Sequence, residues 1–201
     1  MLGLPKATQL HKQLPKKSIY TKFRMNTAAR EKIDADIARI VIVNEVSPAR
    51  THIALGEQIQ AIFVVQVSLK KKDFDERSII AISKLIPQNL LLVLEHGDEA
   101  KLAIYHTKLM QTPWQPKDGF SVELKGLTLD AVWENIIVQV GGVHVEGGKS
   151  LDEQLVIDDR RQRIEKEIER LEKQARKEKQ PKKKFELVMK VNTLKKEVEN
   201  V

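Results

Sequence analysis

The first question is whether the chain carries the side chains of a metal-dependent nuclease. Such an enzyme needs an acidic residue on one strand and a Glu-x-Lys motif on the next, which together hold a metal ion and position a water molecule. The strongest strand pattern, residues 59–69, has Gln66 near this place, and Lys70 follows. Three carboxylates lie upstream, those of Asp34, Asp36 and Glu57. Glutamine is neutral and holds a divalent cation more weakly than a carboxylate does. We therefore interpret Gln66 as a hydrogen-bonded strand residue, and a divergent metal-dependent nuclease is kept as an alternative hypothesis.

Other catalytic motifs are absent from the sequence. There is no cysteine, so no thiolate nucleophile, disulfide or cysteine-ligated metal can form. No H-x-H or H-E-x-x-H pair occurs among the five histidines, which are His11, His52, His96, His106 and His144. The glycines at positions 141, 142, 147 and 148 follow a predicted helix and form no phosphate-binding loop, and no serine lies in a G-x-S-x-G motif. The sequence therefore predicts no catalytic residue, no cofactor and no metal site.

The two tryptophans are candidates for stacking on single-stranded nucleic acid. Trp133 has helical spacing to Ile136 and Val140, which favours packing in a core. Trp114 is flanked by Pro113 and Pro116 and is expected in a loop. Trp114 is therefore the better candidate for surface contact.

A dense cationic segment near the C-terminus is the best candidate for binding. Residues 170–184 contain eight Lys or Arg against two Glu. The predicted nucleic-acid-binding residues are Arg176, Lys177, Lys179, Lys182, Lys183 and Lys184. Clustered cations suit a phosphate backbone. Phe185 is the only aromatic residue next to them, which argues against sequence-specific recognition of nucleic acid. An acidic protein surface, or simple solvation of a helix end, is the alternative.

Two helices are predicted to position these cations. Apolar residues recur at alternating steps of four and three on both sides of a break at Gln180-Pro181. The first set is Ile164, Ile168, Leu171 and Ala175, and the second is Leu187, Val191, Leu194, Val198 and Val201. Each set lies on one narrow stripe of a helix, and two such stripes can bury each other. The pattern predicts an antiparallel helical hairpin, a coiled-coil arm over residues 149–201, with the cations at its tip.

The remaining residues, 1–148, are predicted to form an α/β body. We expect helices at residues 27–38, 74–86 and 129–140, and strands at residues 40–43, 59–69, 90–95 and 100–106, with a short edge strand at 122–124. Expected caps are a capping box at Asp73 and Glu76, Thr128, and a capping box at Ser150 and Glu153. Residues 59–95 suggest a βαβ crossover. The predicted fold class is α/β (α+β), with a mixed, mostly antiparallel sheet flanked by helices and the C-terminal hairpin.

Charge is distributed unevenly along the chain, whose net charge is +7. The first 32 residues carry eight Lys or Arg and one Glu, whereas residues 33–150 carry twelve Lys or Arg and fifteen Asp or Glu. No secretory leader pattern and no apolar run long enough for a membrane span are evident. The sequence therefore predicts a cytoplasmic location and no membrane partner.

Several runs of residues resemble an uncharacterised bacterial family that is described only as a domain of unknown function. These runs are residues 85–94 (LIPQNLLLVL), 129–134 (LDAVWE), 178–187 (EKQPKKKFEL) and 194–196 (LKK). Genes of that family often lie beside helicase and DNA-methyltransferase genes in restriction-like or anti-phage defence loci. The resemblance thus implies an accessory role in DNA handling with a helicase or DNA methyltransferase as partner, and it supplies no catalytic residue.

Three functions are therefore carried forward as hypotheses. The main prediction is a non-catalytic accessory subunit of a DNA-targeting complex, which docks a larger enzyme and contacts nucleic-acid backbone through its basic surfaces. The second is the divergent metal-dependent nuclease. The third is a structural protein that forms homo-oligomers through its C-terminal hairpin.

Overall fold

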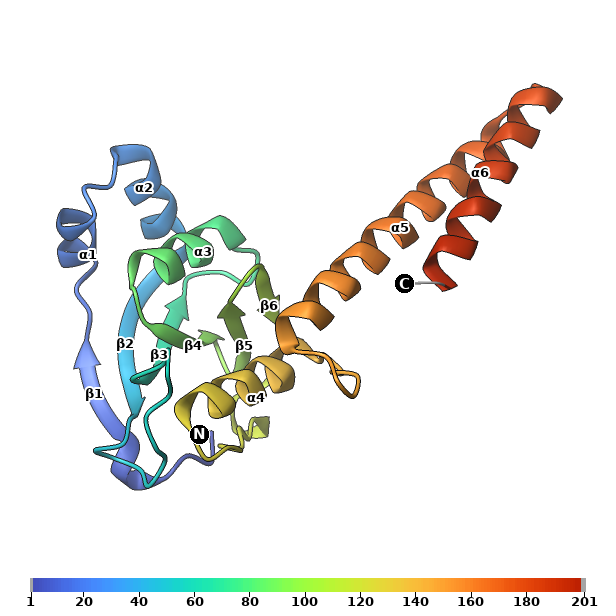
Figure 1. Ribbon diagram of the computed structural model, residues 1–201. Helices are drawn as coiled ribbons and strands as arrows, with labels where there is room; N and C mark the ends of the chain where they lie inside the picture. The colour runs from blue at the N-terminus through green and yellow to red at the C-terminus, as the bar shows by residue number, and fades with distance from the viewer. Residues whose placement is uncertain (1, 200–201) are drawn as a thin grey trace. The chain divides into compact units, whose positions relative to one another are not determined.

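The computed structural model describes residues 2–199 and divides into two compact units, Met1–Val143 and His144–Val201. The first unit is an α/β body and the second is a helical hairpin (Figure 1). The predicted fold class is confirmed. Independent folding of the two units stays a prediction. No helix within residues 2–199 combines the length and the apolar character needed to cross a membrane.

Seven strands form one mixed sheet within the described residues. They are β1 (Gln9–Gln13), β2 (Ile37–Val46), β3 (Ile62–Leu69), β4 (Asn89–His96), β5 (Glu99–Tyr105), β6 (Leu109–Gln111) and β7 (Gln115–Pro116). Strands β1 to β6 lie in chain order, and β7 pairs with β5. Only β3 and β4 pair in parallel, with Gln66 beside Val93. Because parallel strands need a crossover, this pair confirms the predicted βαβ unit.

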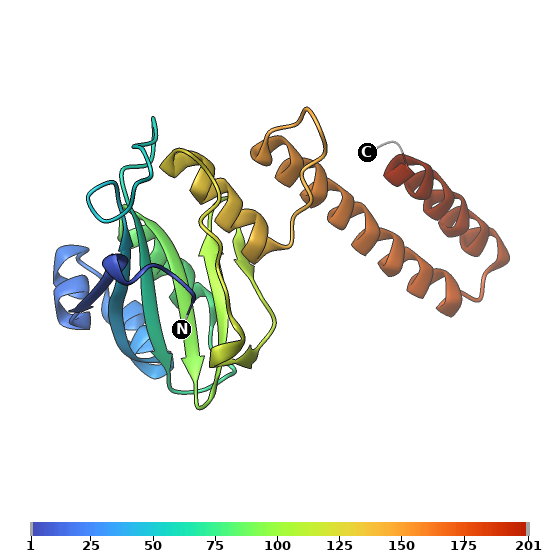
Figure 2. The same cartoon turned by 90° about the horizontal axis from the view of Figure 1, so that it is seen from below.

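The centre of the sheet is apolar on both faces, as the sequence of residues 59–69 predicts. In β3, Val64, Val65 and Val67 are all almost fully buried. Alternate residues of a strand point to opposite faces, so both faces of β3 must be covered. Val65 and Val67 belong to a core formed with the helices α1 (Lys16–Lys22), α2 (Thr27–Asp36) and α3 (Glu76–Leu85). Helix α4 (Leu129–Gly141) packs beside β5 and β6 (Figures 1 and 2).

Local capping signals explain where most helices begin. The side chain of Thr128 accepts a hydrogen bond from the Ala131 amide at the start of α4, and Ser150 and Glu153 form a complete capping box at the start of α5. Helix α4 ends at Gly141, and the next residue, Gly142, has a left-handed φ of 61° that a glycine adopts without steric cost. These caps and the burial of Trp133 confirm the predictions.

Two predictions about local structure are wrong. Asp75, and not Asp73, caps α3, because its carboxylate accepts a hydrogen bond from the Arg77 amide. Residues 122–124 form no strand. Their backbone groups bond elsewhere: the Val122 amide donates to the Leu2 carbonyl, and the Glu123 amide donates to the Gln139 side chain. The sheet edge is formed instead by β1, β6 and β7, which the sequence patterns did not indicate.

The second unit consists of α5 (Leu151–Lys177) and α6 (Pro181–Glu199), which lie side by side (Figures 1 and 2). Apolar side chains of the predicted stripes are buried along the seam, with Ile164, Leu171, Ala175 and Val191 at most 9% exposed. The Arg160–Glu197 and Lys195–Glu172 ion pairs also join the helices. The predicted hairpin is therefore confirmed, whereas Val201 lies outside the described residues.

Candidate nucleic-acid interface

The six predicted binding residues all lie at the tip of the hairpin, around the loop of residues 178–180 that joins α5 to α6. Arg176 and Lys177 end α5, where cations interact favourably with the helix dipole. Pro181 begins α6, a position at which its missing N–H costs nothing. Lys182, Lys183 and Lys184 follow in the first turn of α6, which contains no acidic residue. We call the six residues the tip cluster.

The three lysines of α6 are placed unfavourably in electrostatic terms. The N-terminus of a helix carries a partial positive charge, so cations in the first turn destabilise it and anions stabilise it. All three side chains are exposed, which limits the cost through solvent screening. An anion at this turn would interact favourably with both the dipole and the lysines.

Ion pairing distinguishes five members of the tip cluster from the neighbouring cations of α5. Farther along α5, Arg170 pairs with Glu167 and Lys173 pairs with Glu169. Arg176 lies 3.9 Å from Glu172. Within residues 2–199, no ion pair involves the other five members, which are Lys177, Lys179, Lys182, Lys183 and Lys184. The charge of these five lysines is therefore exposed to solvent and is not neutralised by an ion pair among residues 2–199.

A groove of about 510 Å³ lies between α5 and α6 next to the tip. It is lined by Gln174, Lys177, Glu178, Lys183, Glu186, Leu187 and Lys190. Lys177 and Lys183 connect this groove to the tip cluster. Lys190 is a further cation that reasoning from sequence missed, because it lies two helical turns from the charged run and only the packing of α6 on α5 brings it to the groove.

The side chains considered for nuclease chemistry are brought together only in part: Lys70 lies beside Asp34, whose backbone carbonyl accepts a hydrogen bond from Lys70 Nζ at 2.5 Å, whereas Gln66 and Glu57 have other partners. The Gln66 side-chain amide donates a hydrogen bond to Glu95 Oε2 at 2.7 Å, as expected for a structural strand residue. Glu95 is 6% exposed and its Oε2 lies 3.3 Å from Lys117 Nζ, while its Oε1 has no hydrogen-bond partner among the described residues. Glu57 has an exposed side chain, and its backbone amide donates to Asp130 Oδ2 at 2.6 Å.

The two upstream carboxylates are each engaged by neighbouring cations and hydroxyl groups. Asp34 pairs with Lys16 and accepts a hydrogen bond from the Tyr20 hydroxyl; the Lys16 hydrogen bond lowers the pKa of Asp34. Burial and the bond to Asp34 together raise the pKa of Tyr20. Asp36 pairs with Lys71 at 3.1 Å. Within residues 2–199, no three His, Asp or Glu side chains lie close enough together to hold a metal ion.

Comparison with known families matches nearly the whole chain. Residues 2–198 match the family model described as domain of unknown function DUF4391. The chain belongs to the DUF4391 family. Neither the search of curated proteins nor the search of solved structures gave a match. The activity of this DUF4391 protein must therefore be argued from its own residues.

Trp114, the second aromatic candidate, is half-buried in this DUF4391 protein and packs against the core beneath α1, α2 and α3. Two ammonium groups approach its ring, Lys72 Nζ at 5.7 Å and Lys101 Nζ at 5.5 Å from the centroid. Partial burial lowers the pKa of Lys101, although nearby Glu76 acts in the opposite direction. The ring therefore already interacts with cations of the chain itself.

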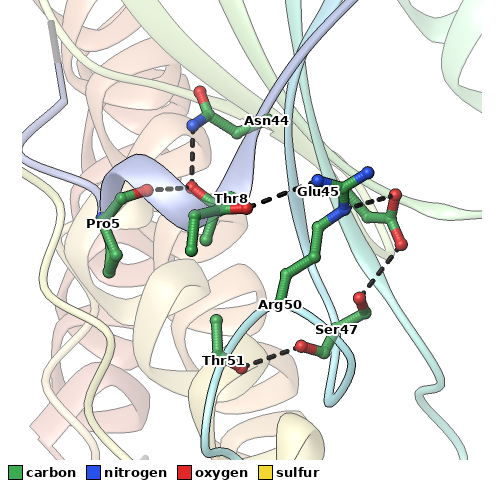
Figure 3. A network of polar contacts seen from close by, with 8 residues as sticks. Pro5, Thr8, Asn44, Glu45, Ser47, Arg50 and Thr51 are labelled. Atoms are coloured by element: carbon green, nitrogen blue, oxygen red, sulfur yellow. Dashed lines mark hydrogen bonds and ion pairs between the residues drawn. The ribbon is translucent and has the colours of Figure 1, made fainter.

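The N-terminal segment encloses a second cavity, of about 570 Å³, on the face of the sheet that carries Gln66 and Val93. Polar contacts hold this segment to β2 (Figure 3). Asn44 donates to Thr8 Oγ1 at 2.8 Å, and Arg50 donates to the Ala7 carbonyl while pairing with Glu45. The lining residues are Leu2, Gly3, Leu4, Lys6, Gln9, Leu10, His11, Val43, Asn44, Gln66 and Val93. The cavity mixes apolar and polar groups and contains no arrangement of a nucleophile with a base.

Proposed function

We propose that this protein is a non-catalytic accessory subunit of a DNA-targeting complex, whose hairpin tip contacts the backbone of nucleic acid. One observation carries the proposal: the five lysines at positions 177, 179 and 182–184 are gathered at one turn without an ion pair among the described residues. Mutual repulsion of such charges is relieved when phosphates neutralise them and condensed counterions are released.

The chemistry of the tip cluster favours contact with the backbone over reading of bases. Lysine ammonium groups bind phosphates as point charges, whereas base recognition in the duplex relies on bidentate Arg, Asn or Gln contacts in a groove. Apart from Arg176, the cluster consists of lysines. Binding should therefore be insensitive to sequence and strongly dependent on salt.

Docking of a larger enzyme is the second half of the proposal. The family resemblance implies a helicase or a DNA methyltransferase, in a restriction-like or anti-phage defence system of the cytoplasm. Two large apolar side chains of the body support a docking surface, since Leu55 is 60% exposed and Leu127 is 88% exposed. Their loops lie together, because the Ala54 amide donates to the Leu127 carbonyl at 3.1 Å. Exposed apolar residues that cluster are typical of interaction sites.

A salt titration of binding to duplex DNA tests the phosphate contact. Changing Lys182, Lys183 and Lys184 together to Gln should weaken binding equally on unrelated sequences. It should also reduce the slope of log K against log salt by up to about three, at about 0.9 per lost contact. Circular dichroism should show unchanged helicity, because these side chains are exposed.

A matched control removes the same charge in the middle of α5. The variant Arg160→Gln, Arg163→Gln, Lys166→Gln loses three cations, of which Arg160 and Arg163 are already ion-paired. We expect it to bind DNA almost as the unaltered protein does. Equal weakening by both variants, or unchanged binding by the tip variant, would refute the proposal. Cleavage of DNA or RNA with Mg²⁺ or Mn²⁺ present would instead favour the nuclease hypothesis.

A further inference from the structure

A second surface of the hairpin is not used by the phosphate contact. Phe185, Val188 and Met189 of α6 are 66%, 40% and 51% exposed. Their spacing of three and four residues places them together on one face of the helix. We call this face the outer stripe. The inner stripe of α6, with Leu187, Val191 and Leu194, follows the same spacing and packs on α5.

Exposure of the outer stripe is unusual within the described part of the chain. Of the six large apolar side chains that are strongly exposed there, three belong to this one face, and the others are Leu55, Leu127 and Val156. Single exposed apolar residues are ordinary on protein surfaces, whereas a contiguous group marks a binding surface. The outer stripe is therefore an apolar surface that the hairpin itself leaves uncovered.

The charge around the outer stripe identifies the chemistry of that partner. Helix α6 contains six lysines and three glutamates. At 100° per residue, Lys182 lies about 60° from Phe185 on one side of the stripe, and Lys184 lies about 100° away on the other. Both lysines are exposed and form no ion pair among residues 2–199. Glu186, about 100° from Phe185 on the side of Lys182, is the acidic residue beside the stripe. A complementary surface should therefore be apolar along its centre and acidic where it meets Lys182 and Lys184.

We propose that the outer stripe binds an acidic amphipathic helix of a partner protein, which converts the two-helix arm into a three-helix bundle. An apolar stripe on one helix is matched by a stripe on another through packing of ridges into grooves. A second copy of α6 would bring lysines against lysines, which disfavours self-pairing. The inference goes beyond the phosphate contact; it shares Lys182 and Lys184 with that contact, but the apolar side chains of the outer stripe are its own.

Peptide binding to the full-length protein provides the test. The probe is a fluorescein-labelled three-heptad peptide with Leu at the a and d positions and Glu at the flanking positions, and the reference peptide has Lys in place of Glu. The neutral variant Phe185→Gln, Val188→Gln, Met189→Gln removes the stripe without changing charge. The control is Val156→Gln on α5, where an equally exposed apolar side chain (68%) lies outside the stripe.

We expect fluorescence anisotropy to show micromolar binding of the acidic peptide, weaker at high salt, and no binding of the lysine peptide. The stripe variant should bind about 30-fold more weakly or worse, and the Val156 control should be unchanged. Phe185→Ala alone should weaken binding about 5-fold, which keeps the test valid if the triple variant loses helicity.

Several results would overturn the inference. They are failure of the unaltered protein to bind the acidic peptide, equal affinity in the stripe variant, and equal binding of both peptides. Sedimentation that shows a dimer dissolved by the stripe variant would assign the stripe to a second copy instead. Loss of DNA affinity in the stripe variant, whose lysines are intact, would assign Phe185 to base stacking. Failure of the phosphate contact is recognised in a different measurement: the DNA affinity of the variant in which Lys182, Lys183 and Lys184 are changed to Gln would equal that of the unaltered protein.

Discussion

Gln66 on β3 and Glu95 on β4 are joined by a hydrogen bond of 2.7 Å between Nε2 and Oε2. The sequence pattern makes Gln66 the candidate position for a metal-binding carboxylate in a nuclease. An amide donates this bond at any pH, whereas an ionised carboxylate at position 66 would have no hydrogen to donate to Glu95. The hydrogen bond to Glu95 thus explains why a neutral glutamine is found at this position. A search for catalytic residue types does not reveal this structural role.

Replacing Gln66 with Glu should destabilise the protein in a pH-dependent manner. Two carboxylates at this distance cannot both ionise cheaply, so the pKa of the pair rises above that of the unfolded chain. When the pKa of a carboxyl group is higher in the folded state than in the unfolded state, the folded protein keeps its stability at low pH and loses it as pH rises. We expect Gln66→Glu to be close to wild type near pH 4, below the unfolded pKa of about 4.3, and about 1–3 kcal/mol less stable near pH 8 in urea unfolding. The control Gln60→Glu lies at an exposed position. Equal destabilisation at both pH values would contradict this account.

Asp36 should make the body sensitive to acid. Burial alone would raise its pKa, but hydrogen bonds from Lys71, the Asp75 amide and the Ser78 hydroxyl outweigh burial and hold the pKa below the usual value. A depressed pKa contributes stability above the unfolded value of about 3.9, and this contribution is lost as pH falls through the folded pKa.

The corresponding test is Asp36→Asn. At pH 7 it should cost about 2–4 kcal/mol, because Asp36 is only 2% exposed and its partners lose a charged acceptor. The difference from wild type should shrink as pH falls below about 4 and through the depressed folded pKa, below which the carboxylate is protonated in both states. Asp73→Asn, at an exposed position, is the control. A cost that does not change with pH would show that shape and not charge matters at this site.

Gly56 should tolerate no side chain while Asp130 is present. A Cβ atom at Gly56 would lie 2.1 Å from Asp130 Oδ1. The Asp130 carboxylate accepts hydrogen bonds from the amides of Glu57, Gln58 and Ile59, so the loop cannot easily move away. We expect Gly56→Ala to cost about 1–3 kcal/mol in thermal or urea unfolding.

A double-mutant cycle identifies the cause of that cost. In an Asp130→Ala background the clash is absent, so adding Gly56→Ala should cost less than it does in the wild type. Gly119→Ala, where the nearest side-chain atom would be 3.8 Å away, serves as the neutral control. Additive costs would mean that Asp130 is not the obstacle.

The body should fold without the hairpin. The division between the two units lies at Val143–His144, and no buried strand spans it. A chain ending at Gly148 should remain soluble and unfold in one cooperative transition measured by calorimetry or circular dichroism. Its melting temperature should differ little from that of the body in the full-length chain. A molten or insoluble product would mean that the hairpin contributes to the core of the body.

Signals confined to a few neighbouring residues made parts of this structure predictable. The caps at Thr128 and Ser150 depend on groups within three residues, and the stripes of the hairpin repeat every three or four residues. Short-range rules decide such features. The same reasoning failed at Asp73, because Asp75 is an equally suitable cap only two residues away and contacts with Asp36 favour it.

The sequence by itself determined the central strands, the hairpin and the charge of its tip, because β-branched runs, helical periodicity and clustered lysines act locally. Only the tertiary structure decided the sheet edges, the pairing of Gln66 with Glu95 and the exposure of the outer stripe. Strand β1 exists because Gln9 pairs with Asn44, far along the chain. Likewise, both faces of α6 carry large apolar residues, so the sequence alone does not show which face packs on α5. Contacts between distant residues depend on the folded path of the chain, which local patterns do not specify.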